Sequence, residues 1–313
     1  MKILFYMPHA DAGAWLHDFA RALPDADLRE WQPGDRAPAD FAVVWRPPRE
    51  MFEGRDDLRA VFNLGAGVDA LLALEQANPG TLPRRAQLVR LEDSGMAPQM
   101  AEYVTHAVLR YMRRFDEYER QQTERRWREI EPHPRATFIV GVLGLGVLGA
   151  HVAKTLASFD LPVRGYSRGA KQIDGVTTYA GDAQFDAFLD GAKVLVNLLP
   201  HTPDTRDVLN ARTFSKLARG AYVVNVARGG HLVEQDLLDA LARGQLAGAT
   251  LDVFREEPLP PGHPFWREPR ITITPHISAL TLREDSVVQV TRKIQAMMRG
   301  EPVTGVVDLA RGY

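Results

Sequence analysis

Short apolar runs recur along the second part of the chain, and an amphipathic stretch separates each run from the next. Runs rich in Val, Ile and Leu are typical of strands that are buried on both faces of a parallel sheet. The runs predict strands at residues 137–143, 161–166, 193–199, 221–227, 247–254 and 270–275. The stretches between them predict helices at residues 147–159, 184–190, 211–219 and 234–243. This alternation favours right-handed βαβ crossovers and a doubly wound parallel sheet.

The first hundred residues repeat the alternation on a smaller scale and predict a second α/β lobe. The strands expected there are residues 2–7, 27–31, 40–45, 58–64 and 86–91. A helical pattern follows Gly67. Two longer amphipathic stretches, 100–128 and 281–299, bracket the central part of the chain and are candidate connecting helices.

Composition narrows the class of protein. The chain has 313 residues, 45% of them hydrophobic and 25% charged, so it can bury the cores of two domains. Its formal net charge of −2 gives no overall attraction to nucleic acid or to an anionic membrane. The absence of cysteine excludes disulfides, thiolate metal sites and thiol nucleophiles, and it is typical of a reducing compartment. The apolar run at the N-terminus is too short for a signal peptide or a membrane span, so we predict a cytoplasmic protein.

Residues 110–136 carry eight arginines, a composition that a nucleic-acid-binding arm would have. Six acidic residues are interspersed among them. Mixed charge of this kind favours a solvated or subunit-packing helix with local ion pairs. We therefore expect no nucleic-acid partner.

A glycine motif marks a candidate cofactor site. Gly144, Gly146 and Gly149 form Gly-Leu-Gly-Val-Leu-Gly directly after an expected strand and directly before an expected helix. The first glycine permits a tight turn, the second lets the backbone approach a pyrophosphate, and the third lets helix and strand pack closely. The helix N-terminus then faces the anion. This context predicts a Rossmann dinucleotide-binding domain.

The expected fold class is α/β, with two doubly wound parallel-sheet domains. The Rossmann NAD(P)-binding domain would span residues 101–279. It would be inserted into a smaller, flavodoxin-like domain that binds the substrate and is made of residues 1–100 and 280–313.

The end of the second strand of the Rossmann domain indicates which dinucleotide is bound. NAD-specific sites place a carboxylate there, which accepts hydrogen bonds from the adenosine ribose. Here the strand ends in Ser167 and Arg168, and Lys171 follows closely. A hydroxyl and two cations are suited to a 2′-phosphate, which arginine binds through bidentate hydrogen bonds. The sequence therefore predicts NADP(H), with NAD(H) used less well; the alternative is that both cations are ordinary surface residues.

Four polar residues follow predicted strands, at the edge of an open parallel sheet where ligands collect. They are His201, Arg228, Glu257 and His276. A cation could bind an anionic substrate and polarise its carbonyl, an imidazolium could supply a proton, and a carboxylate could orient the imidazole. Position in the sequence does not choose between the two histidines. The alternative for Arg228, Glu257 and His276 is a buried salt-bridge cluster without a catalytic role. No group of His, Asp and Glu has the spacing of metal ligands, so no metal is expected.

Six motifs in order resemble those of the D-isomer-specific 2-hydroxyacid dehydrogenases, over essentially the whole chain. They are NLGAGVD at 63–69, GLGVLG at 144–149, VNLLPHTPDT at 196–205, VNVARGG at 224–230, LDVFREEPLP at 251–260 and TPHISA at 274–279. Within the family, the chain is most similar to the bacterial branch that reduces glyoxylate and hydroxypyruvate. The resemblance implies NADPH-dependent reduction of glyoxylate to glycolate and of hydroxypyruvate to D-glycerate, with hydride supplied by the nicotinamide C4.

The resemblance also implies a catalytic set, Arg228, Glu257 and His276. Arg228 would bind the substrate carboxylate and carbonyl, His276 would protonate the carbonyl oxygen, and Glu257 would hold His276 in its reactive form. His201 would lie in a loop on the cofactor side. Asp252 would meet the nicotinamide carboxamide. The cofactor contacts implied are Gly144, Gly146, Val147, Leu148, Gly149, Ser167, Arg168, Lys171, Leu199, Pro200, Thr205, Val226, Ala227 and Asp252.

The substrate contacts that the resemblance implies are Trp45, Gly65, Ala66, Gly67, Arg228 and His276. Backbone amides of the 65–67 loop would bind the substrate carboxylate without a charged side chain. Trp45 would favour small keto acids by filling part of the pocket. If Trp45 instead packs in the core of its lobe, larger keto acids such as phenylpyruvate become the alternative substrates. A homodimer packed through residues 100–128 is also implied.

Two other branches of the family bear on the function. Formate dehydrogenases lack the acidic partner of the histidine, so the presence of Glu257 favours keto-acid reduction. Corepressor relatives keep the catalytic residues but act as nucleotide-sensing binding proteins, and they remain the alternative outside catalysis. Regulatory scaffolds often carry disordered tails, and the composition indicates none here.

Overall fold

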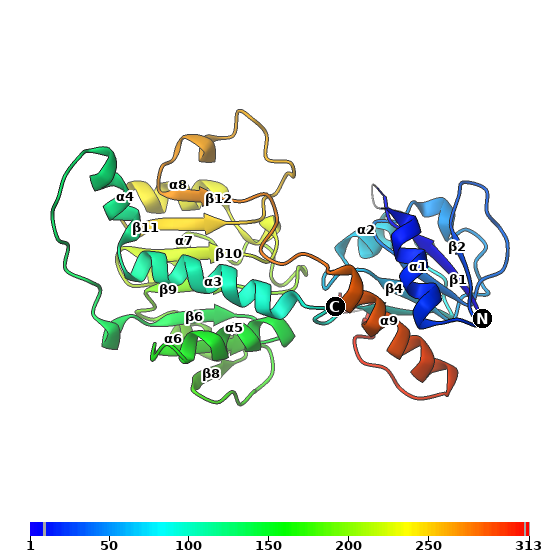
Figure 1. The fold of residues 1–313 in the computed structure, drawn as a ribbon. Coiled ribbons are helices and arrows are strands. Elements are labelled where there is room, and N and C mark those ends of the chain that lie inside the picture. Colours follow the sequence, from blue (N-terminus) through cyan, green and yellow to red (C-terminus); the bar gives the residue numbers. More distant parts are fainter. Residues whose placement is uncertain (9–10, 310, 313) are drawn as a thin grey trace. The chain divides into compact units, whose positions relative to one another are not determined.

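The chain folds into two compact units, each built on a parallel sheet (Figure 1). The computed structural model describes residues 1–8, 11–309 and 311–312. Unit 1 comprises Met1–Gly95 and Thr281–Tyr313, and unit 2 comprises Met96–Leu280. The α/β class with two parallel-sheet domains, expected from the sequence, is confirmed.

Unit 1 contains a five-stranded sheet in the order β2-β1-β3-β4-β5, with every neighbouring pair parallel. This is the strand order of flavodoxin-like sheets. The strands are β1 Lys2–Tyr6, β2 Asp27–Glu30, β3 Phe41–Val44, β4 Ala60–Asn63 and β5 Gln87–Arg90. The helices are α1 Ala12–Ala22, the short 3₁₀ helix η1 Arg49–Met51, α2 Asp69–Ala77 and α9 Arg283–Met298.

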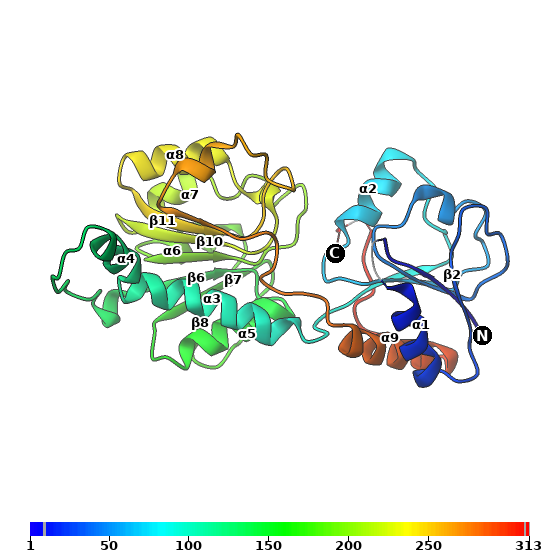
Figure 2. The same cartoon turned by 45° about the horizontal axis from the view of Figure 1, so that its top comes forward.

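The C-terminal segment returns to complete unit 1. Helix α9 lies beside α1 in both views (Figures 1 and 2), and Val306 then forms an antiparallel bridge with Val89 of β5. The amine of Lys293 donates to the carbonyl oxygens of Arg90 at 3.2 Å and Thr304 at 2.9 Å. These bonds tie the end of the chain to the edge of the sheet.

Unit 2 contains a seven-stranded parallel sheet in the order β12-β11-β10-β9-β6-β7-β8. The strands are β6 Val140–Leu143, β7 Val163–Ser167, β8 Val176–Ala180, β9 Val194–Asn197, β10 Ala221–Asn225, β11 Leu246–Leu251 and β12 Ile271–Ile273. The strand order reverses between β6 and β9, which creates the crevice where ligands bind in such sheets. The α-helices are α3 Met96–Met112, α4 Phe115–Thr123, α5 Val147–Ala157, α6 Phe185–Leu189, α7 Ala211–Lys216 and α8 Glu234–Ala242. The 3₁₀ turns are η2 Arg135–Thr137, η3 Asp182–Gln184, η4 Gly229–His231 and η5 Pro264–Arg267.

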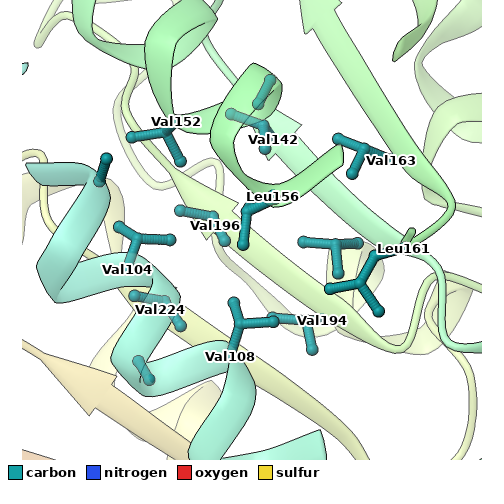
Figure 3. Close-up of a cluster of buried hydrophobic side chains, with 14 of the residues drawn as sticks. Val104, Val108, Val142, Val152, Leu156, Leu161, Val163, Val194, Val196 and Val224 are labelled. Atoms are coloured by element: carbon teal, nitrogen blue, oxygen red, sulfur yellow. The ribbon is translucent and has the colours of Figure 1, made fainter. Parts of the chain in front are cut away.

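Both faces of the central strands of unit 2 are buried, which explains their continuous apolar sequences. On one face, Val104 of α3 and Leu156 of α5 pack over Val194 and Val196 of β9 (Figure 3). On the other face, Leu195 of the same strand packs in a second cluster with residues of α6, α7 and α8. Neighbouring residues of one strand therefore serve two separate cores.

Two segments differ from the sequence-based expectation. Strand β8 was not predicted, because it lies at the edge of the sheet and most of its side chains are half-buried, so its sequence contains no apolar run. The stretch 100–128 is not a single helix. Helix α3 ends at Met112, Arg114 adopts a left-handed conformation with φ of 59°, and α4 begins at the next residue.

Candidate active site

The glycine motif forms a tight turn between β6 and α5. Gly144 has φ of +94°, and a Cβ atom there would lie 2.7 Å from the carbonyl oxygen of Leu198. A Cβ at Gly149 would lie 1.8 Å from the carbonyl oxygen of Gly144, so only glycine allows the helix to approach the strand this closely. A Cβ at Gly146, the residue before α5, would meet nothing within 4 Å. The N-terminus of α5, which begins with Val147 and Leu148, thus presents backbone amides on an uncrowded side of the turn.

Two cations follow the end of β7, and one of them contacts this turn. The amine of Lys171 donates to the carbonyl oxygen of Leu145, inside the glycine motif. Arg168 is exposed, and its guanidinium lies 3.5 Å from a carboxylate oxygen of Asp204. The hydroxyl of Ser167, which is 9% exposed, donates to the carbonyl oxygen of Gly169 at 2.8 Å. Ser167, Arg168 and Lys171, the three residues expected to distinguish NADP(H) from NAD(H), therefore lie at or just after the carboxyl end of β7.

Three adjacent strands carry the expected catalytic residues. Arg228 follows β10, Glu257 follows β11 and His276 follows β12, and these strands are neighbours in the sheet. Because the strands are parallel, their carboxyl ends meet at the same edge. The chain thereby brings a guanidinium, a carboxylate and an imidazole to one place.

His276 and Glu257 are directly paired. The Nδ1 atom of His276 lies 2.8 Å from Oε2 of Glu257, and the backbone amide of Phe254 donates to Oε1 at 3.0 Å. Partial burial raises the pKa of Glu257, but the hydrogen bonds from His276 and Phe254 and the positive charges of His276 and Arg228 outweigh it, so this pKa lies below its ordinary value. The His276 side chain is 40% exposed and that of Glu257 30%, which does not fit the alternative of a buried salt-bridge cluster.

Asp252 shapes the loop that carries His276. Its side chain is fully buried, and its carboxylate accepts the amides of Ile277 and Ser278, both at 2.8 Å, and the hydroxyl of Thr274 at 2.6 Å. Its carbonyl oxygen also accepts the amide of His276 at 2.9 Å. These bonds hold His276 in a left-handed conformation with φ of 57°, which is uncommon for a residue other than glycine. The expected contact of Asp252 with nicotinamide stays a prediction beside this observed role.

The structure separates the two candidate histidines. His201 lies in the loop after β9, where its ring contacts that of His231 at a centroid distance of 5.4 Å. A Cβ at Gly230 would lie 2.5 Å from its Nε2 atom. His276, in contrast, lies within hydrogen-bond distance of Glu257. Leu199, Pro200 and Thr205 belong to the same loop as His201, and Val226 and Ala227 directly precede Arg228.

Three polar residues near Arg228 were not singled out from the sequence. Asn197 and Asn225 are the last residues of β9 and β10, and they are paired in the sheet register. His231 lies in η4, directly after Arg228. All three are 0% exposed. The sequence contains one signal, since each of two successive apolar runs ends in an asparagine. However, a polar residue after a strand is also typical of an exposed loop, so this signal does not predict burial.

Unit 1 contains the 65–67 loop and Trp45. The buried side chain of Asn63 donates to the carbonyl oxygens of Gly65 at 3.1 Å and Gly67 at 2.9 Å, and so fixes the loop that also contains Ala66. A Cβ at Gly65 would lie 2.4 Å from the Trp45 ring, so the ring rests on the glycine backbone. Trp45 is half-buried and does not belong to the fully buried core, which weighs against the core-packing alternative.

The described part of the chain contains no group of three or more His, Cys, Asp or Glu residues that could hold a metal ion. None of its helices is long and apolar enough to cross a membrane.

Comparison with known proteins assigns the family. A model of the "D-isomer specific 2-hydroxyacid dehydrogenase, NAD binding domain" matches residues 105–278, more than half of the chain. The chain therefore belongs to the D-isomer-specific 2-hydroxyacid dehydrogenases, an oxidoreductase family, as the sequence motifs indicated.

Among curated proteins, the chain is 55% identical to glyoxylate/hydroxypyruvate reductase A of Serratia proteamaculans and 54% identical to that of Yersinia enterocolitica. Both matches cover 100% of each chain. A solved 2-hydroxyacid dehydrogenase of Xanthobacter autotrophicus in complex with NADPH has a TM-score of 0.93 and 39% identity, covering 100% of this chain and 99% of that one. An NADPH-dependent glyoxylate/hydroxypyruvate reductase of Sinorhizobium meliloti in complex with NADP and sulfate has a TM-score of 0.91 and 36% identity, with the same coverage.

Proposed function

We propose that this chain is an NADPH-dependent reductase of small 2-keto acids, which converts glyoxylate to glycolate and hydroxypyruvate to D-glycerate. The pairing of His276 with Glu257, beside Arg228 at the ends of three neighbouring strands, carries the proposal. The two full-length relatives named as glyoxylate/hydroxypyruvate reductases support the choice of substrate.

The residues of unit 2 fit a dinucleotide that carries a 2′-phosphate. The uncrowded turn at Gly146 and the N-terminus of α5 suit the pyrophosphate, and Arg168 and Lys171 suit the additional phosphate. When bound, NADPH supplies a hydride from its nicotinamide C4 to the keto carbon. NADH lacks the 2′-phosphate and should be used less well. The two solved relatives that hold NADPH or NADP support this preference.

Arg228, His276 and Glu257 have different roles in the proposed reaction. Arg228 binds the anionic keto acid and polarises its carbonyl, which stabilises the negative charge that develops on oxygen. His276 donates a proton to that oxygen as the hydride reaches carbon, and solvent later returns a proton to the imidazole. Because Glu257 occupies Nδ1 of His276, the donated proton leaves from Nε2. Through the same hydrogen bond, Glu257 fixes the orientation of the imidazole ring.

Unit 1 would set the size of the substrate. The amides of the 65–67 loop would bind the substrate carboxylate, and Asn63 holds that loop in shape. Trp45 rests on Gly65 of this loop and is half-buried, which supports a role for its ring in restricting the size of the substrate. This arrangement favours glyoxylate and hydroxypyruvate over phenylpyruvate.

We further propose a homodimer that acts in the cytoplasm, where NADPH serves as a reductant. Large aromatic side chains are exposed on α4 and the segment after it: Phe115 is 49% exposed, Tyr118 36% and Trp127 completely. Exposed aromatics of this size are enriched at protein interfaces. Light scattering should give a dimer mass, and W127S should shift the equilibrium towards monomer. A wild-type monomer at micromolar concentration would contradict the dimer.

Initial rates test the function. Loss of NADPH absorbance should be fast with glyoxylate and hydroxypyruvate, slow with pyruvate and phenylpyruvate, and slower throughout with NADH. Faster turnover of phenylpyruvate would replace the proposal with a reductase of larger keto acids. Tight NADPH binding without turnover of any keto acid would favour a nucleotide-sensing protein.

A further inference from the structure

A buried polar network lies at the base of Arg228. Asn197 and Asn225 end β9 and β10, strands that are otherwise apolar except for Tyr222, and His231 lies in η4. All three residues are fully buried. Burying polar groups costs free energy unless each is hydrogen-bonded, so a satisfied network here needs a reason other than core stability.

Asn225 is bonded to the backbone on both sides of the Ala227–Arg228 peptide bond. Its Nδ2 donates to the carbonyl oxygen of Arg228 at 3.1 Å, and its Oδ1 accepts the amide of Ala227 at 3.3 Å. The amide of His231 donates to the same Arg228 carbonyl at 3.2 Å. The direction in which the Arg228 side chain leaves the strand end is therefore fixed by a side chain three residues earlier in the sequence.

Asn197 and His231 hold Asn225 in turn. Nδ2 of Asn197 donates to Oδ1 of Asn225 at 3.0 Å and lies 2.8 Å from Nδ1 of His231. Because an amide nitrogen only donates, Nδ1 of His231 must accept, and the ring proton resides on Nε2. Nε2 lies 3.3 Å from the carbonyl oxygen of Pro200. The network therefore runs from Arg228 to the 199–205 loop on the cofactor side.

The turn that follows Arg228 is also tightly packed. A Cβ at Gly229 would lie 1.9 Å from the carbonyl carbon of Phe254, the residue whose amide binds Glu257. The backbone after Arg228 thus rests directly on the segment that holds the partner of His276.

We propose that Asn225, held by Asn197 and His231, is a positioning residue for Arg228 that sets the direction of its guanidinium toward the keto acid. The inference rests on the substrate-binding role proposed above for Arg228. In this role Asn225 does not contact the substrate or the cofactor. The effect of Asn225 on kcat/KM should therefore depend entirely on Arg228.

A double-mutant cycle tests this dependence. N225A should lower kcat/KM for glyoxylate about tenfold or more, mainly through KM for the keto acid, because small misplacements of a binding group can cost up to about 100-fold. In an R228K background the same change should cost less than about threefold, since the group that Asn225 positions is already replaced. The dissociation constant of NADPH should stay within about twofold throughout. Equal losses in both backgrounds would overturn the proposal.

Three further variants separate positioning from loss of stability. Y222F removes a buried hydrogen bond, 2.9 Å to Thr250, from the same strand but away from Arg228. It should lower the melting temperature without changing KM for glyoxylate. If N225A does not fold, H231N and H231L serve instead: H231N keeps an acceptor for Asn197 and should retain more of kcat/KM than H231L. Equal kcat/KM in these two variants would overturn the proposal.

Binding of oxamate, an unreactive keto-acid analogue, to the NADPH complex distinguishes this inference from the proposed function. If the wild type turns over no keto acid, the proposed function fails, and oxamate affinity still measures whether N225A acts through Arg228. N225A should weaken oxamate binding in the wild-type background and not in R228K. If turnover is present and oxamate binding is weakened equally in both backgrounds, only the positioning role fails.

Discussion

Nδ1 of His276 lies 2.8 Å from Oε2 of Glu257, and the second carboxylate oxygen of Glu257 accepts the amide of Phe254. Each oxygen thus has a fixed partner, so the carboxylate cannot turn away from the imidazole without losing a bond. The pair is partly exposed and follows two neighbouring strands, which fits a reacting group better than a structural salt bridge.

Glu257→Gln should lower kcat/KM for glyoxylate about 100-fold, because the imidazole loses the carboxylate that fixes the orientation of its ring. Initial rates measure the effect, with E256Q on the neighbouring exposed residue as the control. A kcat/KM equal to that of the wild type would remove Glu257 from the catalytic set.

The same variant should change how stability depends on acid. The pKa of Glu257 in the folded chain lies below its ordinary value of 4.5. A carboxyl group with a lowered pKa stabilises the fold above its ordinary pKa, and this contribution is lost as the pH falls through the lower value. The urea midpoint of the wild type should therefore decline more steeply than that of E257Q below about pH 4.5. Parallel curves would show that the pair adds nothing to stability.

Arg168→Ala should raise KM for NADPH about tenfold or more and leave KM for NADH nearly unchanged, since only the former carries the 2′-phosphate. Asp204 lies 3.5 Å from the guanidinium and would compete with a bound 2′-phosphate for it. D204N should therefore change KM for NADPH in the opposite direction. Steady-state kinetics with both cofactors tests these two variants together. Equal changes in KM for NADPH and NADH would contradict the assignment of Arg168 to a 2′-phosphate site.

Trp45→Ala should raise kcat/KM for phenylpyruvate relative to glyoxylate, because the ring that we propose to restrict the substrate volume is removed. A ratio of specificity constants for the two substrates measures the effect. W266A, which alters a 53% exposed tryptophan of unit 2, is the matched control and should leave the ratio unchanged. If W45A and W266A behave alike, Trp45 does not set substrate size.

Lys293→Met should destabilise unit 1 by about 1–3 kcal/mol, because Glu92 and two backbone carbonyls lose a buried donor. The urea midpoint should fall, while kcat with glyoxylate stays close to that of the wild type. R299M removes an exposed ion pair with Glu301 beyond the end of the same helix and should not move the midpoint measurably. Equal midpoints for K293M and the wild type would refute the anchoring role of Lys293.

The sequence predicted elements well where a strand is buried on both faces. Leu195 lies in one core and its neighbours Val194 and Val196 in another, so the whole run had to be apolar and could be recognised. Strand β8 lies at the sheet edge and has no such constraint, which is why it was missed. The break at Arg114 was missed because charged residues on either side continue an amphipathic pattern through it.

In the candidate site, too, some residues could be predicted from the sequence and others could not. Arg228, Glu257 and His276 could be proposed because polar residues directly after strands of a parallel sheet meet at one edge. Both His201 and His276 follow strands, so the choice between them needed a family resemblance. The hydrogen bond between His276 and Glu257 could not be predicted from the sequence and is given by the structure. Asn197, Asn225 and His231 could not be identified, because their burial and mutual bonds depend on the register between β9 and β10.

The most direct test of the proposed reaction is His276→Ala, measured by single-turnover oxidation of NADPH with saturating glyoxylate and by fluorescence titration of NADPH. We predict that hydride transfer slows by about 100-fold to 10,000-fold, because the proposed proton donor to the carbonyl oxygen is lost. The dissociation constant of NADPH should remain within about twofold of the wild-type value. Unchanged hydride transfer in H276A would show that the His276–Glu257 pair does not carry the reaction.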